Sequence, residues 1–398
     1  MNIIINTSTF SNSNIDSSPK FINNLILNFD IKNNYFVLYP RKTTKPDEKL
    51  FPNNITLIPY RYIFPNSLSN LSEIGLLPSI KQNKLNIIKI SLLIISQFFH
   101  LIYLIVKIKP QIIYSHWVFP QAFISSILGK IFNVKTVFTS HGSDLKILSK
   151  IGTIGNKILN FTLKNSTKFT VVSSLCLNYF SSENLKKYQN KLDVIPMGIS
   201  EQFFTANDSK LDSKEYTNIL FYGRMIDYKG IDLLINSIYK LVNENNFKIR
   251  CKLIGDGVEK PKYEKLVKSL TLEDHITFES FLTQSKLIEE IDLADLVVIP
   301  SKLTDIEFEA GPLSLIESMS RKKICVVSNS VGFASLVNEK NSVLFKSNDQ
   351  DNLYKKIIYV LNLDTDKKKE IENNAYEYSK NFKFSKISKK TEDFLFNL

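Results

Sequence analysis

The sequence has few cysteines, and it has no long low-complexity tract that would indicate disorder. The three cysteines, Cys176, Cys251 and Cys325, lie far apart without CxxC spacing, each in or beside an apolar run. We therefore expect reduced core residues in a cytosolic protein and no disulfide framework. The first ten residues, MNIIINTSTF, lack the basic, apolar and small-residue order of a secretion signal, so we expect a buried first strand there.

A net acidic charge is also absent, since basic residues exceed acidic ones by 12 and the isoelectric point is near 9.2. A basic chain favours an anionic partner, which here includes nucleic acid, phosphorylated small molecules and an acidic membrane surface. The lysines are scattered and often stand beside asparagine, so part of this charge is compositional. Because the chain has no RNP-like motif and no zinc-finger spacing, we expect no nucleic-acid partner.

One apolar segment, residues 90–106, approaches the length that spans a membrane. Lys89 and Lys107 flank its 17 residues, which still include the polar side chains of Ser91, Ser96, Gln97 and His100. A spanning helix needs about 20 predominantly apolar residues, so the segment favours a core helix packed on a sheet. A helix lying in the membrane interface is the main alternative, and a true span is the third.

Length and periodicity predict two α/β domains. At 398 residues the chain exceeds the size of a single core, and short β-branched runs alternate with amphipathic stretches throughout. The expected strands are 3–6, 35–39, 55–59, 111–114, 136–140, 168–173 and 193–196, then 218–222, 248–254, 276–278, 296–299, 323–328 and 342–345. Periodicity stops within residues 198–216, so we place the domains at 1–200 and 201–380.

Ligands of open parallel sheets bind at the carboxyl ends of the strands, and two such ends in the first domain carry histidine. QIIY runs into SHWVFP and TVFTS runs into HGSDL, which places His116 and His141 just past two strands. A single loop histidine is more often structural, but two of only four histidines at equivalent positions favour a working pair. No acidic or cysteine partner stands at ligand spacing, so we expect no metal site.

The first strand of the second domain runs into YGRMIDYKGIDLL, a pattern suited to an anion. Gly223 lets the backbone turn close to a ligand, and Arg224 offers a planar fork for a diphosphate. Lys229 adds a second charge before a helix that starts near residue 231, whose free N–H groups and dipole favour the same anion. The alternative is a capped surface turn.

The next strand ends in LIGDG, where Gly255 and Gly257 frame Asp256. Taken alone, this pattern is typical of a simple turn. It also allows the backbone to approach a base or ribose.

The segment FEAGPLSLIESM places Glu309 and Glu317 on either side of a Gly-Pro step. Pro312 has no N–H and a fixed φ, so we expect a helix from about residue 313, with Glu309 ahead of it and Glu317 about one turn inside. Gly311 leaves the free N–H groups of that helix open. Two carboxylates around such a helix start suit a ligand rich in hydroxyls; the alternative is a loop acid and a surface helix acid.

Seven segments occur in one order over residues 110–340: SHWVFPQAF, TSHGSDL, VIPMGI, FYGRMIDYKGIDLLINSI, LIGDG, ADLVVIPS and EAGPLSLIESM. In this order they resemble the retaining glycosyltransferases of family 4, which have the GT-B architecture of two Rossmann-like parallel-sheet domains facing across a cleft. Glu309 and Glu317 match the ends of that family's E-x7-E signature. The resemblance implies sugar transfer from a nucleotide diphosphate sugar with retention of configuration.

The resemblance implies roles in the second domain. Arg224 and Lys229 would neutralise the leaving diphosphate. Glu317 would hold the ribose hydroxyls, and Glu309 would contact the donor sugar near the reacting carbon. The remaining expected donor contacts are Gly223, Asp256, Ser301, Gly311, Pro312, Leu313 and Ser314. Because Arg224, Lys229 and the helix start supply positive charge, the resemblance implies no metal and no other cofactor.

In the first domain, the resemblance implies that His141 contacts hydroxyls of the donor sugar, and we add His116 as a substrate contact. The family's glycine-rich loop after the first strand is missing, since residues 6–16, NTSTFSNSNID, contain no glycine. We therefore assign no site residue before His116. The ending 381–398 resembles the helix that crosses back to the first domain, which would let the domains close on the activated sugar.

These observations predict a cytoplasmic enzyme, free or peripheral at the inner face of the plasma membrane, that moves a hexose from a UDP- or GDP-sugar to a glycan or lipid-linked acceptor. SHWVFPQAF resembles bacterial exopolysaccharide and O-antigen transferases, which favours assembly of exopolysaccharide, capsule or O-antigen. Two alternatives stay open. One is a sugar-nucleotide epimerase or hydrolase on the same fold, and the other is a degenerate binding subunit, which the glycine-free loop favours.

Overall fold

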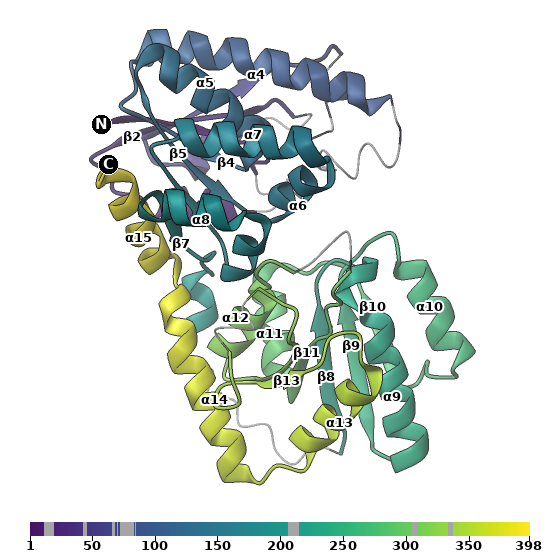
Figure 1. Ribbon diagram of the computed structural model, residues 1–398. Coiled ribbons are helices and arrows are strands. Elements are labelled where there is room, and N and C mark those ends of the chain that lie inside the picture. Colours follow the sequence, from purple (N-terminus) through teal and green to yellow (C-terminus); the bar gives the residue numbers. More distant parts are fainter. Residues whose placement is uncertain are drawn as a thin grey trace. The chain divides into compact units, whose positions relative to one another are not determined.

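The computed structural model describes residues 1–11, 20–42, 46–65, 68–69, 71, 83, 85–205, 215–304, 309–332 and 337–398. Within them the chain forms two compact α/β units (Figure 1). The first unit contains Met1–Val172, Cys176–Pro196 and Phe384–Leu398, and the second contains Ser173–Leu175 and Met197–Lys383. The last helix, α15 (Phe384–Phe396), therefore belongs to the first unit.

The first unit has a seven-stranded parallel sheet in the order β3-β2-β1-β4-β5-β6-β7. The strands are β1 Asn2–Asn6, β2 Asn34–Pro40, β3 Ile55–Tyr60, β4 Ile112–His116, β5 Lys135–Ser140, β6 Lys168–Val171 and β7 Leu192–Val194. Each lies within two residues of the strand expected from the sequence. Ile3 pairs with Tyr35 on one side and with Ile112 on the other, which makes β1 a central strand.

Helices cover both faces of this sheet, as the alternation along β1 requires. Ile3 and Ile5 pack on the face covered by α1 and α15, whereas Ile4 packs on the opposite face with α4 and α5. The helices are α1 Phe21–Leu27, α4 Asn86–Ile108, α5 Phe123–Phe132, α6 Ser143–Lys150, α7 Gly152–Asn165 and α8 Ser182–Tyr188. The Tyr35 hydroxyl donates to Glu392 Oε1 of α15 over 2.5 Å, which fixes α15 to the sheet.

The second unit has a six-stranded parallel sheet in the order β10-β9-β8-β11-β12-β13. Its strands are β8 Thr217–Tyr222, β9 Ile249–Ile254, β10 Ile276–Glu279, β11 Leu296–Ile299, β12 Ile324–Ser328 and β13 Val343–Phe345, again within two residues of expectation. Its helices are α9 Ile231–Asn245, α10 Lys260–Ser269, α11 Gln284–Leu293, α12 Leu313–Ser320, α13 Gln350–Leu361 and α14 Thr365–Ser379.

In each sheet the order of the strands reverses at one point, beside the strand that comes first in the sequence of that unit. In the first unit this point lies between β1 and β4, and in the second it lies between β8 and β11. Ligands of such sheets bind outside the carboxyl ends of the strands at this switch point. The fold therefore directs attention to the residues that follow β4, β8 and β11.

The helix α4 corrects one expectation, because it is not a core helix on all sides. Leu93, Leu101 and Leu104 are buried, whereas Ile95 and Phe99 are more than half exposed. By length and composition α4 could cross a membrane, and only 22% of its most apolar window is buried. The three cysteines, in contrast, are buried as predicted, and no disulfide joins them to one another.

Candidate active site

Three predicted residues of the second unit meet at the carboxyl ends of β8 and β11. Lys229 and Glu309 form an ion pair through Nζ and Oε2, with only 14% and 12% of their side chains exposed. The Ser301 hydroxyl lies 3.5 Å from the same Glu309 oxygen. The Gly332 amide donates to the Glu309 carbonyl over 2.6 Å, so the backbone of Glu309 is held as well. The structure thus brings the Lys229 cation to a carboxylate and a hydroxyl that lie more than 70 residues further along the chain.

The turn that presents Lys229 is shaped by a glycine. Residues Asp227–Lys229 form a single 3-10 turn, and Gly230 follows in the left-handed region with φ 68°. A Cβ on Gly230 would lie 2.0 Å from the carbonyl oxygen of Pro300, so the turn packs directly on the end of β11. The Lys302 amide donates to the Tyr228 carbonyl over 2.7 Å and closes this contact. Only glycine fits here without moving Lys229.

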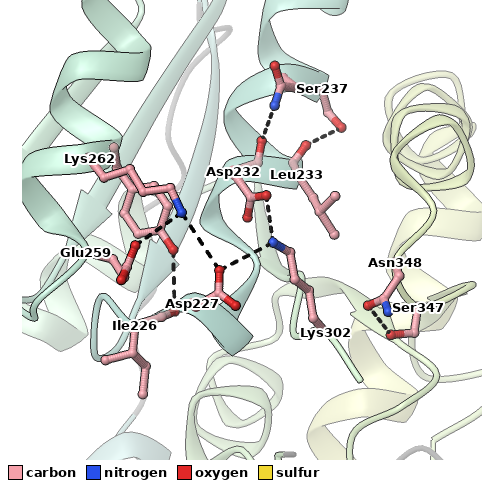
Figure 2. A network of polar contacts seen from close by, with 12 residues as sticks. Ile226, Asp227, Asp232, Leu233, Ser237, Glu259, Lys262, Lys302, Ser347 and Asn348 are labelled. Atoms are coloured by element: carbon pink, nitrogen blue, oxygen red, sulfur yellow. Dashed lines mark hydrogen bonds and ion pairs between the residues drawn. The ribbon is translucent and has the colours of Figure 1, made fainter. Parts of the chain in front are cut away.

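A network of charged side chains surrounds that turn (Figure 2). Lys302 Nζ lies 2.6 Å from Asp232 Oδ2 of α9 and 3.8 Å from Asp227 Oδ1. Lys262 of α10 lies 4.0 Å from Asp227 and 3.2 Å from Glu259. The network links the turn, two helices and the segment after β11. No sequence pattern predicted these pairs, because they depend on contacts between distant segments.

Arg224 is exposed, and the part of the chain that the structure describes offers it no ion pair. The backbone around it is tightly packed, since a Cβ on Gly255 would lie 1.9 Å from the Gly223 carbonyl oxygen, and Gly255 has φ 140°. The Met225 amide donates to the Asp256 carbonyl over 2.8 Å. The turn at residues 255–257 therefore holds the backbone of the Arg224 loop, and the exposed guanidinium is available to bind an anion.

The side chain of Asp256 lies 3.1 Å from Lys260, one turn along the chain. This lysine lowers the pKa of Asp256, so the carboxylate stays ionised. Asp256 thus has a partner within the chain, and its contact with the nucleotide stays a prediction.

The helix α12 begins at Leu313, as the Gly-Pro step predicts. Pro312 is the N-cap and is extended, with ψ 109°, so it stands before the first turn rather than in it. Among the described residues no side chain caps this end, which leaves N–H groups of the first turn, including that of Ser314, for a ligand. The buried face of the helix is Leu315, Ile316 and Met319, as expected.

Glu317 lies inside α12 and is largely buried. Burial raises the pKa of its carboxyl to about 7, although a hydrogen bond with Tyr222 opposes the rise. The Tyr222 hydroxyl donates to the Ser314 carbonyl over 2.8 Å and lies 3.0 Å from Ser318 Oγ, so β8 and α12 are joined there. Among the described residues, the contacts of Glu317 are separate from the Lys229–Glu309 pair.

In the first unit, the two predicted histidines are in direct contact. His116 ends β4 and His141 follows β5, and His116 Nδ1 lies 3.1 Å from His141 Nε2. The rings of Phe21 and Trp117 lie 4.9 and 5.0 Å from the His141 ring. Burial lowers the pKa of His141 to about 3, and burial together with His141 lowers the pKa of His116. Both rings are therefore neutral at pH 7, and one N–H is shared between them.

Asp144 also belongs to this site, although the sequence patterns predicted no role for it. Its carboxylate accepts the Val118 amide over 2.6 Å and the Ser140 hydroxyl over 2.7 Å. Burial raises its pKa, and these hydrogen bonds oppose the rise. This residue is the aspartate of the segment TSHGSDL, which could have indicated it from the sequence. Its hydrogen bonds hold the loop that carries His141. Of the glycine-free loop after β1, residues 12–16 lie outside the described residues.

Two models of known protein families match the chain, one in each half. The family model described as Glycosyl transferases group 1 matches residues 203–378, and the one described as Glycosyl transferase 4-like matches residues 65–173. The chain is a glycosyltransferase of this group 1, family 4-like type. The resemblance drawn from the seven sequence segments is thereby confirmed, while the role of each site residue remains a prediction.

Several curated proteins resemble this glycosyltransferase. An uncharacterized glycosyltransferase of Methanocaldococcus jannaschii is 28% identical over 69% of this chain and 72% of its own length. The N-acetyl-alpha-D-glucosaminyl L-malate synthase of Bacillus anthracis is 25% identical over 57% of this chain. A phosphatidylinositol N-acetylglucosaminyltransferase subunit of Schizosaccharomyces pombe is 25% identical over 73% of this chain. The match spans less than two thirds of the last two proteins, at 58% and 61%.

Solved structures show the same fold. Sucrose-phosphate synthase from Thermosynechococcus elongatus has a TM-score of 0.77 at 16% identity, covering 99% of this chain and 98% of that one. Anabaena HepE in complex with UDP-glucose has a TM-score of 0.71 at 14% identity, covering 100% of both chains. The glycosyltransferase thus has the GT-B architecture, with two Rossmann-like parallel-sheet units.

Proposed function

We propose that this glycosyltransferase transfers a hexose from a UDP- or GDP-sugar, with retention of anomeric configuration, to a glycan or lipid-linked acceptor. The observation that carries the proposal is the cluster of Lys229, Glu309 and Ser301 at the switch point of the second unit, with the exposed Arg224 five residues before Lys229. A leaving diphosphate needs fixed positive charge, and a hexose needs acceptors for its hydroxyls. This cluster contains both.

In the proposed mechanism, Arg224 and Lys229 bind the diphosphate, and the open N-terminus of α12 adds N–H groups. Glu309 accepts hydroxyls of the hexose near its reacting carbon, and Glu317 accepts the ribose hydroxyls. As the bond between the hexose and the diphosphate breaks, the acceptor hydroxyl oxygen bonds to the same carbon and its proton passes to the leaving diphosphate oxygen, while the two cations stabilise the charge that forms on the diphosphate. Because these groups supply the positive charge, the proposed reaction is independent of a metal ion.

Neutral His141 is the proposed hydroxyl partner in the first unit, where the shared N–H with His116 and the Asp144 contacts hold it. The names of similar proteins support the choice of donor and acceptor. HepE was solved with UDP-glucose, another neighbour is a lipopolysaccharide outer core galactosyltransferase, and one relative is named for transfer to phosphatidylinositol. We therefore propose that the enzyme acts in the cytoplasm at the inner membrane face, in surface polysaccharide assembly.

The proposal is tested with purified protein, a panel of nucleotide sugars and lipid-linked acceptors, using product analysis that reports the anomeric configuration. We expect transfer by the wild type, loss of transfer in Glu309→Gln, and normal transfer in Glu289→Gln, an exposed acid of the same unit. Conversion of the donor alone to an epimer or free sugar would favour the epimerase or hydrolase alternative. Tight nucleotide binding without turnover would indicate a binding subunit.

A further inference from the structure

One face of α4 exposes a single stripe of large apolar side chains. The exposed fractions are 61, 40, 54, 63, 56 and 59% for Ile88, Leu92, Ile95, Phe99, Tyr103 and Val106. These residues follow one another at steps of three and four, so they share one side of the helix. At 1.5 Å per residue the stripe is about 27 Å long. An exposed apolar surface of this length is typical of a binding surface.

The opposite face of α4 is bound to the sheet of the first unit. Its buried leucines pack with Ile4, Leu38 and Ile113, and Gln97 Nε2 donates to Asn6 Oδ1 of β1 over 2.6 Å. A helix crossing a bilayer would have to leave this core and expose the buried amides of Gln97 and Asn6 to lipid. The contacts therefore favour a helix that stays on the sheet and offers only its outer face.

The sequence on both sides of α4 is strongly basic. Between Lys49 and Ser143 the sequence contains a single acidic residue, Glu73. The basic residues of the same stretch are Lys49, Arg61, Lys81, Lys84, Lys89, Lys107, Lys109, Lys130 and Lys135. Arg61 lies beside the middle of α4, since the Ser96 hydroxyl donates to its carbonyl over 2.6 Å. Its guanidinium is 5.8 Å from the ring of Phe64, which is 78% exposed.

We propose that the outer face of α4 docks on an anionic phospholipid leaflet, with the helix lying in the plane of the interface. The apolar stripe enters the acyl boundary, and Lys89, Lys107 and Arg61 meet the lipid phosphates. A second copy of the chain would cover the same stripe, but it would oppose like charges. Such docking would keep the enzyme beside a lipid-linked acceptor. This purpose rests on the proposed function.

Sedimentation of the full chain with vesicles tests this surface. We expect binding to vesicles of phosphatidylcholine and phosphatidylglycerol, weaker binding at high salt, and little binding to phosphatidylcholine alone. The double variant Ile95→Ser with Phe99→Ser removes two inserted side chains, so its partition coefficient should fall at least about tenfold. The matched control is Ile31→Ser with Ile154→Ser, which replaces side chains that are 77% and 68% exposed outside α4.

Any of three sedimentation results would overturn the inference: no binding of the wild type to anionic vesicles, equal binding of wild type and the Ile95/Phe99 variant, or equal loss in the control. A dimer that forms through α4 without vesicle binding would assign the stripe to a second copy and would also overturn it. A second variant, Lys89→Gln with Lys107→Gln, should weaken binding to anionic vesicles several-fold. Transfer to a soluble acceptor, measured without vesicles, tests the proposed function separately.

Discussion

Lys229 and Glu309 neutralise each other at the carboxyl end of the second sheet, each with less than a sixth of its side chain exposed. A diphosphate that binds Lys229 competes with Glu309 for the same ammonium group. Donor binding would therefore release the Glu309 carboxylate at the moment when the hexose arrives. We therefore expect different effects on nucleotide binding when Glu309 and Glu317, the two glutamates of the E-x7-E signature, are replaced.

The first prediction separates the two glutamates. Glu309→Gln should lower kcat about a hundredfold or more, because the sugar loses its carboxylate, while UDP or GDP binds as tightly or more tightly, because Lys229 is freed. Glu317→Gln should weaken nucleotide binding about tenfold, since a charged acceptor of the ribose hydroxyls is lost. Calorimetry gives the dissociation constants and steady-state assays give kcat. If Glu309→Gln weakened nucleotide binding and Glu317→Gln spared it, the assignment would be wrong.

The second prediction concerns pH. The pKa of Glu317 is raised to about 7 by burial, so its carboxylate is mostly protonated at pH 6 and mostly ionised at pH 8. Ribose hydroxyls donate to the ionised form, so nucleotide affinity should rise with pH across this range, by about tenfold at most. Binding near pH 6.5 should release a proton, which calorimetry in buffers of different ionisation enthalpy detects.

The control for this pH dependence is Glu317→Gln, whose nucleotide affinity should be nearly constant from pH 6 to pH 8. Glu309→Gln should retain the wild-type dependence. A variant Glu317→Gln that kept the full dependence would place the titrating group elsewhere.

The third prediction tests the network in Figure 2 as the support of the Lys229 turn. Lys302→Met removes the 2.6 Å contact with Asp232, so the turn should lose its fixed position. We expect KM for the donor to rise about three- to tenfold, the equivalent of about 1 kcal/mol, with a smaller change in kcat. Lys240→Met removes a contact of the same length, to Asp351 on the surface, and should leave KM unchanged. Equal kinetics for both variants would show that the network does not position Lys229.

Much of the fold follows from local patterns. A run such as LVVI at 296–299 predicts a buried strand by composition and length, and Pro312 marks the start of α12 because its geometry is fixed. The placement of His116 at the end of β4 and of His141 just after the neighbouring β5 also follows, since parallel strands end at one edge. These predictions depend on neighbours in the chain or on sheet topology alone.

Other features depend on packing that a sequence does not display. The contact of Lys302 with Asp232 joins residues 70 positions apart, and no spacing rule predicts it. The segment 90–106 is short for a membrane span and contains four polar side chains, which favoured a core helix, but the sequence does not show which of its sides a sheet covers. The structure shows that only one side is covered, so the outer stripe needs another explanation.

The fourth prediction concerns the histidine pair of the first unit. Burial holds the pKa of both rings below the usual range, so neither should become protonated between pH 5 and pH 8. Labelled histidine spectra should therefore show no titration of His116 and His141 in this range. His141→Ala should lower kcat about tenfold to a hundredfold, because a hydroxyl partner of the hexose is lost, with nucleotide affinity unchanged.

His116 is a positioning residue in this scheme, since its contact is with His141. His116→Asn keeps a polar group near Nδ1 and should retain more activity than His116→Phe, which removes the 3.1 Å hydrogen bond but fills the space. The readout is the donor KM and kcat together with the nitrogen shifts of His141, which report its tautomer. If His116→Phe changed stability but neither the His141 shifts nor turnover, the pair would be structural, and His141 would have to be oriented by the Asp144 loop alone.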